Sequence, residues 1–532
     1  MSAPSPWPAN WAPADGDAPG AIGGISVAAL AQEYGTPTFV LDLADLRARM
    51  DAWAAAAKEH FADERGLAGA DIYYASKAFT CVSLIRLAVE RGLCADVASG
   101  GELAVALAGG MDPARIGVHG NNKSDEEIAA ALDAGVGRIV VDSLGELDLV
   151  SAAAAERGVI APVFIRVTTG VHAGANEYIA TAHEDQKFGL SLTDGSALAA
   201  ARRAVELPNV SLDGLHQHIG SQISDLEGHA VSTRALLSLR AEISRATGRL
   251  VPEIDLGGGY GITYVEEPTL TADEVCAQMS GVVRAACEVL ETAPPRISFE
   301  PGRNIVGPTM ITLYTVGSIK RVTIGNDSLV ERSEPSERGR NDADAASVEP
   351  SERDRNDADA ASVERRPQAE VETTARDGFD SAQPAVARDG FDSAAPRSLR
   401  LADACSEQAT SERWYVAVDG GMGDTVLRPM LYDAIYTAEV ASRRIPGEQV
   451  RARLVGKHCE SGDILIRDLE LPADLRRGDL IAVPATGAYG RSMSSNYNML
   501  ARSPVIAVEN GSAAPWIHRE TIADMMRSDA AL

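Results

Sequence analysis

The sequence predicts a (β/α)8 barrel joined to a second, mostly β, barrel-like domain that carries a long disordered insertion. Eight short apolar runs alternate with Ala- and Leu-rich segments of helical spacing between residues 72 and 300, which is the pattern of such a barrel. Chemically distinctive motifs also fall where these runs end, and barrels of this kind place their sites at the carboxyl ends of their strands. The alternation alone leaves an open, doubly wound sheet as the alternative.

The composition is that of a soluble globular protein. Hydrophobic residues make up 45% of the 532 residues and charged residues 23%, which supports a large core. The net charge of −27 argues against a nucleic-acid partner. No apolar run is long enough to cross a bilayer, and the N-terminus lacks the features of a secretory signal. The cysteines form no CxxC pair and no metal-like spacing with histidine, so we interpret them as reduced thiols in a cytoplasmic protein without a metal site: 81, 94, 276, 287, 405 and 459.

Taken in order, the chain begins with residues 1–20, which are rich in Pro, Ala, Gly and Asp and predict a disordered tail. A strand follows at 35–42 and a helix at 43–61. The predicted barrel strands lie at 72–76, 94–98, 116–120, 138–142, 161–167, 212–219, 252–257 and 296–300. Helical segments between them include 79–92, 123–135, 144–157, 227–247 and 271–291.

After residue 322 the composition changes. The segment Arg340–Val348 recurs at 355–363, and Ala375–Ala382 recurs at 387–394. These repeats present few large apolar side chains, so residues 327–413 predict a disordered insertion, either a tolerated surface loop or a partner-binding segment. Strand signals return at 416–419, 450–455, 463–466 and 480–484. We therefore expect a barrel over 45–315 and a β-domain made of 21–44, 316–326 and 414–532.

The heptad Tyr73–Phe79 carries the first chemical signal. It begins as an apolar and aromatic run and ends in Lys77, which we place on the last residue of a buried strand. Burial lowers the pKa of a lysine, and a neutral amine is a nucleophile that forms Schiff bases. The alternative is a lysine whose flexible stem reaches back to solvent.

Other polar motifs follow the later strands. These motifs are Asp96, His119–Lys123, His216–Ser221, Asp255–Gly261 and Glu300–Arg303. Each has an ordinary structural explanation: the glycine triplet as a plain turn, His218 as a core histidine, and Glu300 with Arg303 as a local ion pair. Their coincidence with Lys77 on one barrel face is much more specific than any single motif.

Together these residues fit a cofactor with an aldehyde, a phosphate and a protonatable ring nitrogen. Lys77 would take the aldehyde, and the ring would stack on His218 and pair with Glu300. The backbone of the triplet Gly257, Gly258 and Gly259, with Ser221 and Gly302, would hold the phosphate. Pyridoxal phosphate has all three groups.

The sequence resembles the fold-type III pyridoxal-phosphate decarboxylases, and among them the diaminopimelate decarboxylases. The matching stretches are YYASKAF (73–79), GNNKS (120–124), KFG (187–189), HQHIGSQ (216–222), DLGGGYGI (255–262), EPGR (300–303), GGM (420–422), RPMLY (428–432), GKHCESGD (456–463) and GAYG (487–490). Similar enzymes pair a barrel with a C-terminal β-domain that includes the strand near residue 38. They are head-to-tail homodimers with active sites at the subunit interface.

The resemblance also implies residue roles. Lys77 would be the Schiff-base lysine, His218 would act beside it, and Cys459 would be the proton donor, supplied with Glu460 by the neighbouring subunit. The cofactor contacts would be Lys77, Asp96, His218, Ser221, Gly257, Gly258, Gly259, Glu300, Pro301, Gly302, Arg303 and Tyr489. The substrate contacts would be Arg303, Arg428, Tyr432, Glu460 and Tyr489.

The chemistry of these side chains indicates the substrate. A thiol such as Cys459 can protonate a carbanion, although a buried structural cysteine is the alternative. Glu460 suits a distal ammonium, whereas Arg303 and Arg428 suit a distal carboxylate. A substrate with both groups at its far end is meso-diaminopimelate, and lysine would be the product.

Three rival functions are compatible with parts of the pattern. Ornithine and arginine decarboxylases of similar fold act on substrates without a distal carboxylate and carry Asp after the catalytic cysteine. Racemases on a similar barrel use a tyrosine base. Non-catalytic pyridoxal-phosphate carriers lack the second domain. The tripeptide Cys459-Glu460-Ser461 and the second domain argue against all three.

Overall fold

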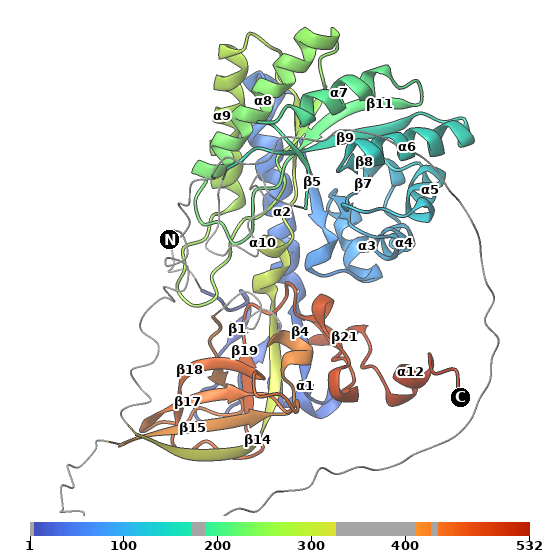
Figure 1. Cartoon of the computed structure of the whole chain (residues 1–532). Helices are drawn as coiled ribbons and strands as arrows, with labels where there is room; N and C mark the ends of the chain where they lie inside the picture. Colours follow the sequence, from blue (N-terminus) through green and yellow to red (C-terminus); the bar gives the residue numbers. More distant parts are fainter. Residues whose placement is uncertain (1–4, 172–186, 326–409, 427–434, 532) are drawn as a thin grey trace, which may run out of the picture. The chain divides into compact units, whose positions relative to one another are not determined.

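The computed structural model describes residues 5–171, 187–325, 410–426 and 435–531 (Figure 1). Residues 1–322 and 412–532 form one compact unit. Most of the predicted insertion lies outside the described residues. The last residues of the predicted insertion are described, and they belong to strand β15 (Thr410–Val418). The predicted end of the insertion at residue 413 therefore lies too late in the sequence.

The first large sheet is a closed parallel barrel. Strand β5 pairs with β6 on one side and β13 on the other, and the ring closes where β8 pairs with β9. This closure confirms the predicted barrel and excludes the open sheet. The eight strands, each matching one predicted run, are β5 (Ala70–Ala75), β6 (Cys94–Val97), β7 (Ile116–Val118), β8 (Arg138–Val141), β9 (Ala161–Thr168), β11 (Val210–His216), β12 (Glu253–Asp255) and β13 (Arg296–Phe299). The two-residue strand β10 (Leu190–Ser191) pairs beside β9.

Three of the helices between the strands begin at serine caps soon after the strands end. Ser99, Ser124 and Ser143 each accept the amide of the residue three positions on, which satisfies a donor that the first helical turn leaves unpaired. Their apolar faces pack on the strands in one continuous core. The helices are α2 (Leu43–His60), α3 (Val82–Glu90), α4 (Gly100–Ala108), α5 (Asp125–Ala134), α6 (Leu144–Arg157), α7 (Ser196–Glu206), α8 (Glu227–Thr247), α9 (Ala272–Val289) and α10 (Arg303–Val306).

The second large sheet is built from both ends of the chain. The N-terminal strand β4 (Thr38–Asp42) lies between β14 (Met310–Gly325) and β20 (Val505–Glu509), as expected for the strand near residue 38. The remaining strands are β15, β16 (Glu439–Val440), β17 (Gln449–Val455), β18 (Ile464–Pro472), β19 (Leu480–Val483) and β21 (Ser512–Ile517). A short helix, α12 (Ile522–Met526), follows. The domain boundaries given above stay predictions.

The prediction of a disordered tail is wrong for residues 5–20. A three-stranded antiparallel sheet of β1 (Trp11–Ala12), β2 (Ala21–Ile22) and β3 (Ile25–Ser26) precedes helix α1 (Val27–Tyr34). Trp11 stacks on Trp7 at 4.8 Å between ring centroids and donates to Glu439 at 2.7 Å. The Pro- and Ala-rich composition suggested disorder, but the two tryptophans provide contacts that order this segment.

No helix in the described part of the chain is long and apolar enough to cross a membrane.

Asn10 fastens this N-terminal segment to the core. Its backbone and side-chain amides donate to the buried carboxylate of Asp42 at 2.9–3.1 Å. We expect Asn10→Ala to lower the free energy of unfolding by about 1–3 kcal/mol, because Asp42 would lose both hydrogen bonds from the Asn10 side-chain amide and keep only the one from its backbone amide. Denaturant unfolding would measure this. Asp17→Ala, an exposed position of the same segment, is the control and should change little; equal stability of both variants would contradict a structural role for the segment.

Candidate active site

Four polar side chains meet at the mouth of the barrel, where the strands end. Glu300 follows β13, His119 follows β7, His216 ends β11, and Asp96 lies in β6; all four are buried. His119 Nε2 lies 3.0 Å from one carboxylate oxygen of Glu300, and His216 Nε2 lies 3.4 Å from the other. His119 Nε2 is also 3.4 Å from Asp96. The closed ring therefore places one carboxylate between two histidines.

Charge is distributed unevenly over this cluster. Burial lowers the pKa of His216 to about 3, so this imidazole is neutral. Burial also acts on His119, but the carboxylates of Asp96 and Glu300 outweigh it and raise its pKa. Burial would raise the pKa of Glu300, yet His119, with His216, holds it well below the usual value. The two histidines thus favour the ionised form of Glu300.

Glu300 fits the predicted role toward a ring nitrogen. Its Oε1 is buried and accepts no hydrogen bond from the described residues, although the His119 ion pair is within reach. A carboxylate with an unused lone pair at the barrel mouth suits a pyridinium N–H. One ligand atom each from His119, His216 and Glu300 also lies within 4.8 Å of the others, so the distances alone would equally admit a metal ion.

Lys77 lies near this cluster but not where it was predicted. Strand β5 ends at Ala75, and Lys77 sits in the 3-10 turn Ser76–Ala78 with its side chain exposed. Its charge acts on two neighbours. Burial and then Lys77 hold the pKa of His218 well below its usual value, and Lys77 opposes the burial that raises the pKa of Asp96 to about 6. The amine is therefore close to the site, but the argument from burial was wrong.

The glycine triplet packs tightly between strand ends. A side-chain carbon on Gly257, Gly258 or Gly259 would lie 2.2–2.4 Å from a backbone oxygen, so only glycine fits there. The Gly257 amide donates to Asp255 at 2.9 Å, and the Gly258 amide to Nδ1 of the half-buried His218 at 3.2 Å. Two of the three amides thus already have acceptors in the chain, and the phosphate role of the triplet stays a prediction.

Arg303 is a buried cation at this mouth. It donates to Tyr264 Oη at 2.7 Å and to Ser221 Oγ at 2.5 Å, and its guanidinium lies 4.9 Å from the ring centroid of Tyr489. Among the described residues it pairs with no carboxylate, which excludes the local ion pair with Glu300. An arginine of this kind is available to an incoming carboxylate.

Neighbouring backbone contacts hold the loops of this mouth together. The Pro301 carbonyl accepts the Ala75 amide at 3.4 Å, and a side-chain carbon on Gly302 would lie 2.9 Å from the Ala75 oxygen. From the β-domain, the Tyr489 amide donates to the Ala78 carbonyl at 2.8 Å. The loop after β13 and the loop of Tyr489 are therefore fixed against the turn that carries Lys77.

Four further predicted residues remain. Arg428 and Tyr432 lie outside the described residues. Cys459 and Glu460 are exposed on the loop between β17 and β18, which excludes the alternative of a buried structural cysteine. No hydrogen bond or ion pair joins this loop to Lys77 or Glu300 within the described chain.

The loop of Cys459 is held from beneath. Asp463 accepts the amide and Nδ1 of His458, each at 2.9 Å, and the Met422 amide at 2.6 Å. The Cys459 amide donates to Asn498 at 2.8 Å. A side-chain carbon on Gly421 would lie 2.4 Å from Asp463, which explains the second glycine of the GGM motif as space for this carboxylate.

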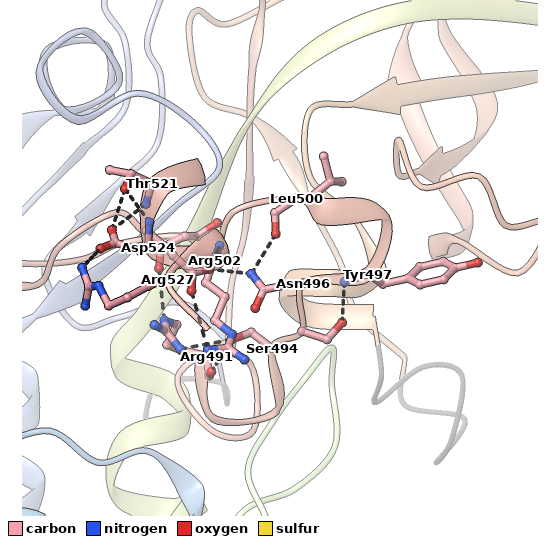
Figure 2. Close-up of polar contacts among 12 residues, drawn as sticks. Arg491, Ser494, Asn496, Tyr497, Leu500, Arg502, Thr521, Asp524 and Arg527 are labelled. Atoms are coloured by element: carbon pink, nitrogen blue, oxygen red, sulfur yellow. Dashed lines mark hydrogen bonds and ion pairs between the residues drawn. The ribbon is translucent and has the colours of Figure 1, made fainter. Parts of the chain in front are cut away.

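The segment that carries Asn498 is itself fixed. Figure 2 shows Asn496 donating to the carbonyl of Leu500, at 3.0 Å, and Arg491 reaching Ser494, at 3.1 Å. The ring of Tyr497 points away from this network and stacks on His458 with 6.0 Å between centroids. Thus Cys459 is exposed on a constrained loop.

Comparisons with known proteins agree with this geometry. Residues 43–307 match the family model "Pyridoxal-dependent decarboxylase, pyridoxal binding domain", and residues 400–487 match "Pyridoxal-dependent decarboxylase, C-terminal sheet domain". Diaminopimelate decarboxylase of Mycobacterium bovis is 39% identical over 98% of this chain and 97% of its own length. The enzyme of Corynebacterium efficiens is 37% identical, over 98% and 93%.

The chain belongs to the diaminopimelate decarboxylases. A solved structure of that enzyme from M. jannaschii in complex with L-lysine superposes with a TM-score of 0.74 at 25% identity, covering 98% of each chain. Membership of this pyridoxal-dependent family decides between the cofactor and a metal at Glu300: pyridoxal phosphate is the cofactor. Lys77, Glu300 and their neighbours have the side chains that its aldehyde and ring nitrogen require.

Sequence reasoning missed two groups in this decarboxylase. His119 and His216 were seen at strand ends, but their contact with Glu300 was not predicted. His458 and Asp463 were read only as part of a motif. The sequence positions could have indicated both groups. His119 and His216 lie at the ends of barrel strands and His458 precedes Cys459, and a buried polar side chain at such a position needs a partner.

We expect Asp463→Asn to lower kcat by on the order of tenfold while leaving the affinity for pyridoxal phosphate unchanged. The Asn side chain would place an NH2 group against the N–H donors of His458 and Met422, and the Cys459 loop would shift. Steady-state kinetics and a cofactor titration would measure both. Asp468→Asn is the matched control: Asp468 is an exposed carboxylate on strand β18, which begins directly after Asp463, and it pairs with Arg451 at 2.8 Å. A variant with normal kcat would show that the carboxylate does not position the loop.

Proposed function

We propose that the protein removes one carboxylate of meso-2,6-diaminopimelate to give L-lysine and carbon dioxide, the last step of lysine biosynthesis. The reaction would take place in the cytoplasm, at two active sites shared between the subunits of a homodimer. The observation that carries the choice of substrate is the buried Arg303, a cation at the barrel mouth whose described partners are neutral hydroxyls.

The cofactor supplies the electron sink. When bound, pyridoxal phosphate accepts the electrons that the departing carboxylate leaves on the α-carbon, provided that its ring nitrogen is protonated. Glu300, kept ionised by His119, would hold that proton. Lys77 would bind the aldehyde and give it up to the substrate amine. His218, kept neutral by burial and by Lys77, presents an uncharged ring to the site.

The chain's own groups would then select the substrate and return a proton. Arg303 would bind the distal carboxylate by its two-pronged guanidinium, with Arg428, Tyr432 and Tyr489 beside it. Glu460 would bind the distal ammonium. Cys459 would deliver a proton to the α-carbon, in the place of the lost carboxylate, and regain one from water.

The placement of Cys459 supports a shared site. Its loop is exposed and forms no described hydrogen bond or ion pair with Lys77 or Glu300 of its own chain, as expected if another copy presents it. Apolar side chains near this loop support an interface, since Tyr497 and Met499 are 42% and 59% exposed and water-exposed apolar clusters of this kind mark association surfaces.

Product analysis would test the substrate. We expect lysine and carbon dioxide from meso-diaminopimelate and neither amine product from ornithine or arginine. Glu460→Gln should lose about 2–5 kcal/mol of transition-state binding for diaminopimelate, because the distal ammonium would lose a desolvated partner. Glu470→Gln, an exposed glutamate on β18, serves as the control. Comparable turnover of ornithine would favour the rival decarboxylase, and normal kcat/KM in Glu460→Gln would place the ammonium elsewhere.

Mixing inactive variants would test the shared site. Lys77→Ala and Cys459→Ala proteins should each be nearly inactive, and only Lys77→Ala should lose the covalent attachment of cofactor by borohydride. An equal mixture should recover up to about a quarter of the activity, since half of the dimers are hybrids with one intact site of two. Lys77→Ala mixed with the Lys77→Ala/Cys459→Ala double variant is the control. No recovery despite demonstrated subunit exchange would rule out an interface site.

A further inference from the structure

Arg138 crosses the interior of the barrel. It opens strand β8 and is 4% exposed. Its guanidinium lies between the rings of Tyr73 and Phe164, 4.1 Å from each centroid. From there it donates to Asp255 at 3.1 Å and to Ser298 at 2.9 Å. These partners belong to β12 and β13, which are not neighbours of β8 in the ring, so the side chain ties opposite walls together.

Asp255 passes this contact on to the glycine triplet. One of its oxygens accepts Arg138, and the other accepts the amide of Gly257 at 2.9 Å. Gly257 has a φ of 70°, and a side-chain carbon there would lie 2.2 Å from the Gln217 oxygen. Its carbonyl accepts the Glu300 amide at 2.9 Å. The start of the triplet is therefore fixed by the carboxylate that Arg138 holds.

Arg138 also supplies the charge that this carboxylate needs. Asp255 is fully buried, and burial, with the charge of Glu300, raises the pKa of Asp255 while Arg138 opposes the shift. Two carboxylates at this depth are costly without a cation between the strand ends. Glu253 shares the same guanidinium at 2.9 Å, nearer the other end of β12.

We propose that Arg138 is a positioning residue for the cofactor: through Asp255 it sets the Gly257–Gly259 backbone that receives the phosphate. This inference rests on the assignment of these glycines to the phosphate. Arg138 lies beneath the triplet and acts only through Asp255. Its removal should therefore weaken recognition of the phosphate more than recognition of the ring or the aldehyde.

Two ligands separate this role from a general loss of stability. The full-length protein, freed of cofactor, would be titrated with pyridoxal phosphate and with pyridoxal, which lacks the phosphate, by absorbance and fluorescence. In Arg138→Met the affinity for pyridoxal phosphate should fall on the order of tenfold or more, the effect expected for a lost charge-assisted hydrogen bond. The affinity for pyridoxal should fall by much less, so the ratio of the two drops.

Further variants keep the test decisive. Arg138→Lys keeps the positive charge but not the two-pronged guanidinium, so its ratio of affinities should lie between those of the wild type and Arg138→Met. If Arg138→Met does not fold, the ratio of Arg138→Lys tests the proposal instead. Adding Asp255→Asn to Arg138→Met should recover part of the ratio, because no buried carboxylate is then left unpaired. Arg240→Met is the matched control. Arg240 is similarly buried, and its only hydrogen-bond acceptors among the described residues are the carbonyls of Val251 and Ala293. This variant should therefore lower Tm without changing the ratio.

Each result has a defined meaning. If Arg138→Met lowers Tm but leaves the ratio at the wild-type value, Arg138 is a structural residue only and the proposal is overturned. If the wild-type protein itself binds pyridoxal as tightly as pyridoxal phosphate, the phosphate assignment of the triplet fails and the proposal fails with it. A reduced ratio in Arg138→Met together with an unchanged ratio in Arg240→Met supports the positioning role.

Discussion

The ionised carboxylate of Glu300, buried at the barrel mouth, is the constraint on which the site depends. A buried charge persists only when cations and hydrogen-bond donors replace the water it has lost. His119 and His216 provide them at 3.0 and 3.4 Å. Their strands, β7 and β11, are not adjacent to β13, so only a closed ring can bring the three side chains together. The ionisation of Glu300 therefore depends on closure of the barrel.

The same principle extends below the mouth. Glu300 lies close enough to Asp255 to disfavour its ionised form. Arg138, from the opposite side of the barrel, donates to Asp255 and favours that form. The barrel interior therefore carries a row of polar, ionisable side chains, with Arg138 beside Asp255 and His119 beside Glu300, where most barrels hold layers of branched apolar side chains. Aromatic rings on both faces of Arg138 fill the space that such layers would occupy.

The β-domain serves this site in two ways. Its Tyr489 loop is hydrogen-bonded to the turn of Lys77 and places a ring beside Arg303. Its loop with Cys459 and Glu460 is instead held outward by Asp463 and His458. Both ends of the chain contribute to the domain, because β4 is paired between β14 and β20. Residues 5–20, whose composition suggests a tail, are ordered because Trp11 and Asn10 find partners in that domain.

The sequence by itself determined the eight barrel strands, the second domain, the cofactor and the family. These follow from local alternation of apolar runs and from motifs at their ends, which need no knowledge of distant contacts. Only the tertiary structure decided which charges are compensated. It paired Glu300 with His119 and His216 rather than with Arg303, and it left Lys77 exposed on a turn beyond its strand. It also joined Arg138 to Asp255 across 117 positions of sequence. Burial and pairing depend on residues that are remote in the chain, and no local pattern encodes their distance in space.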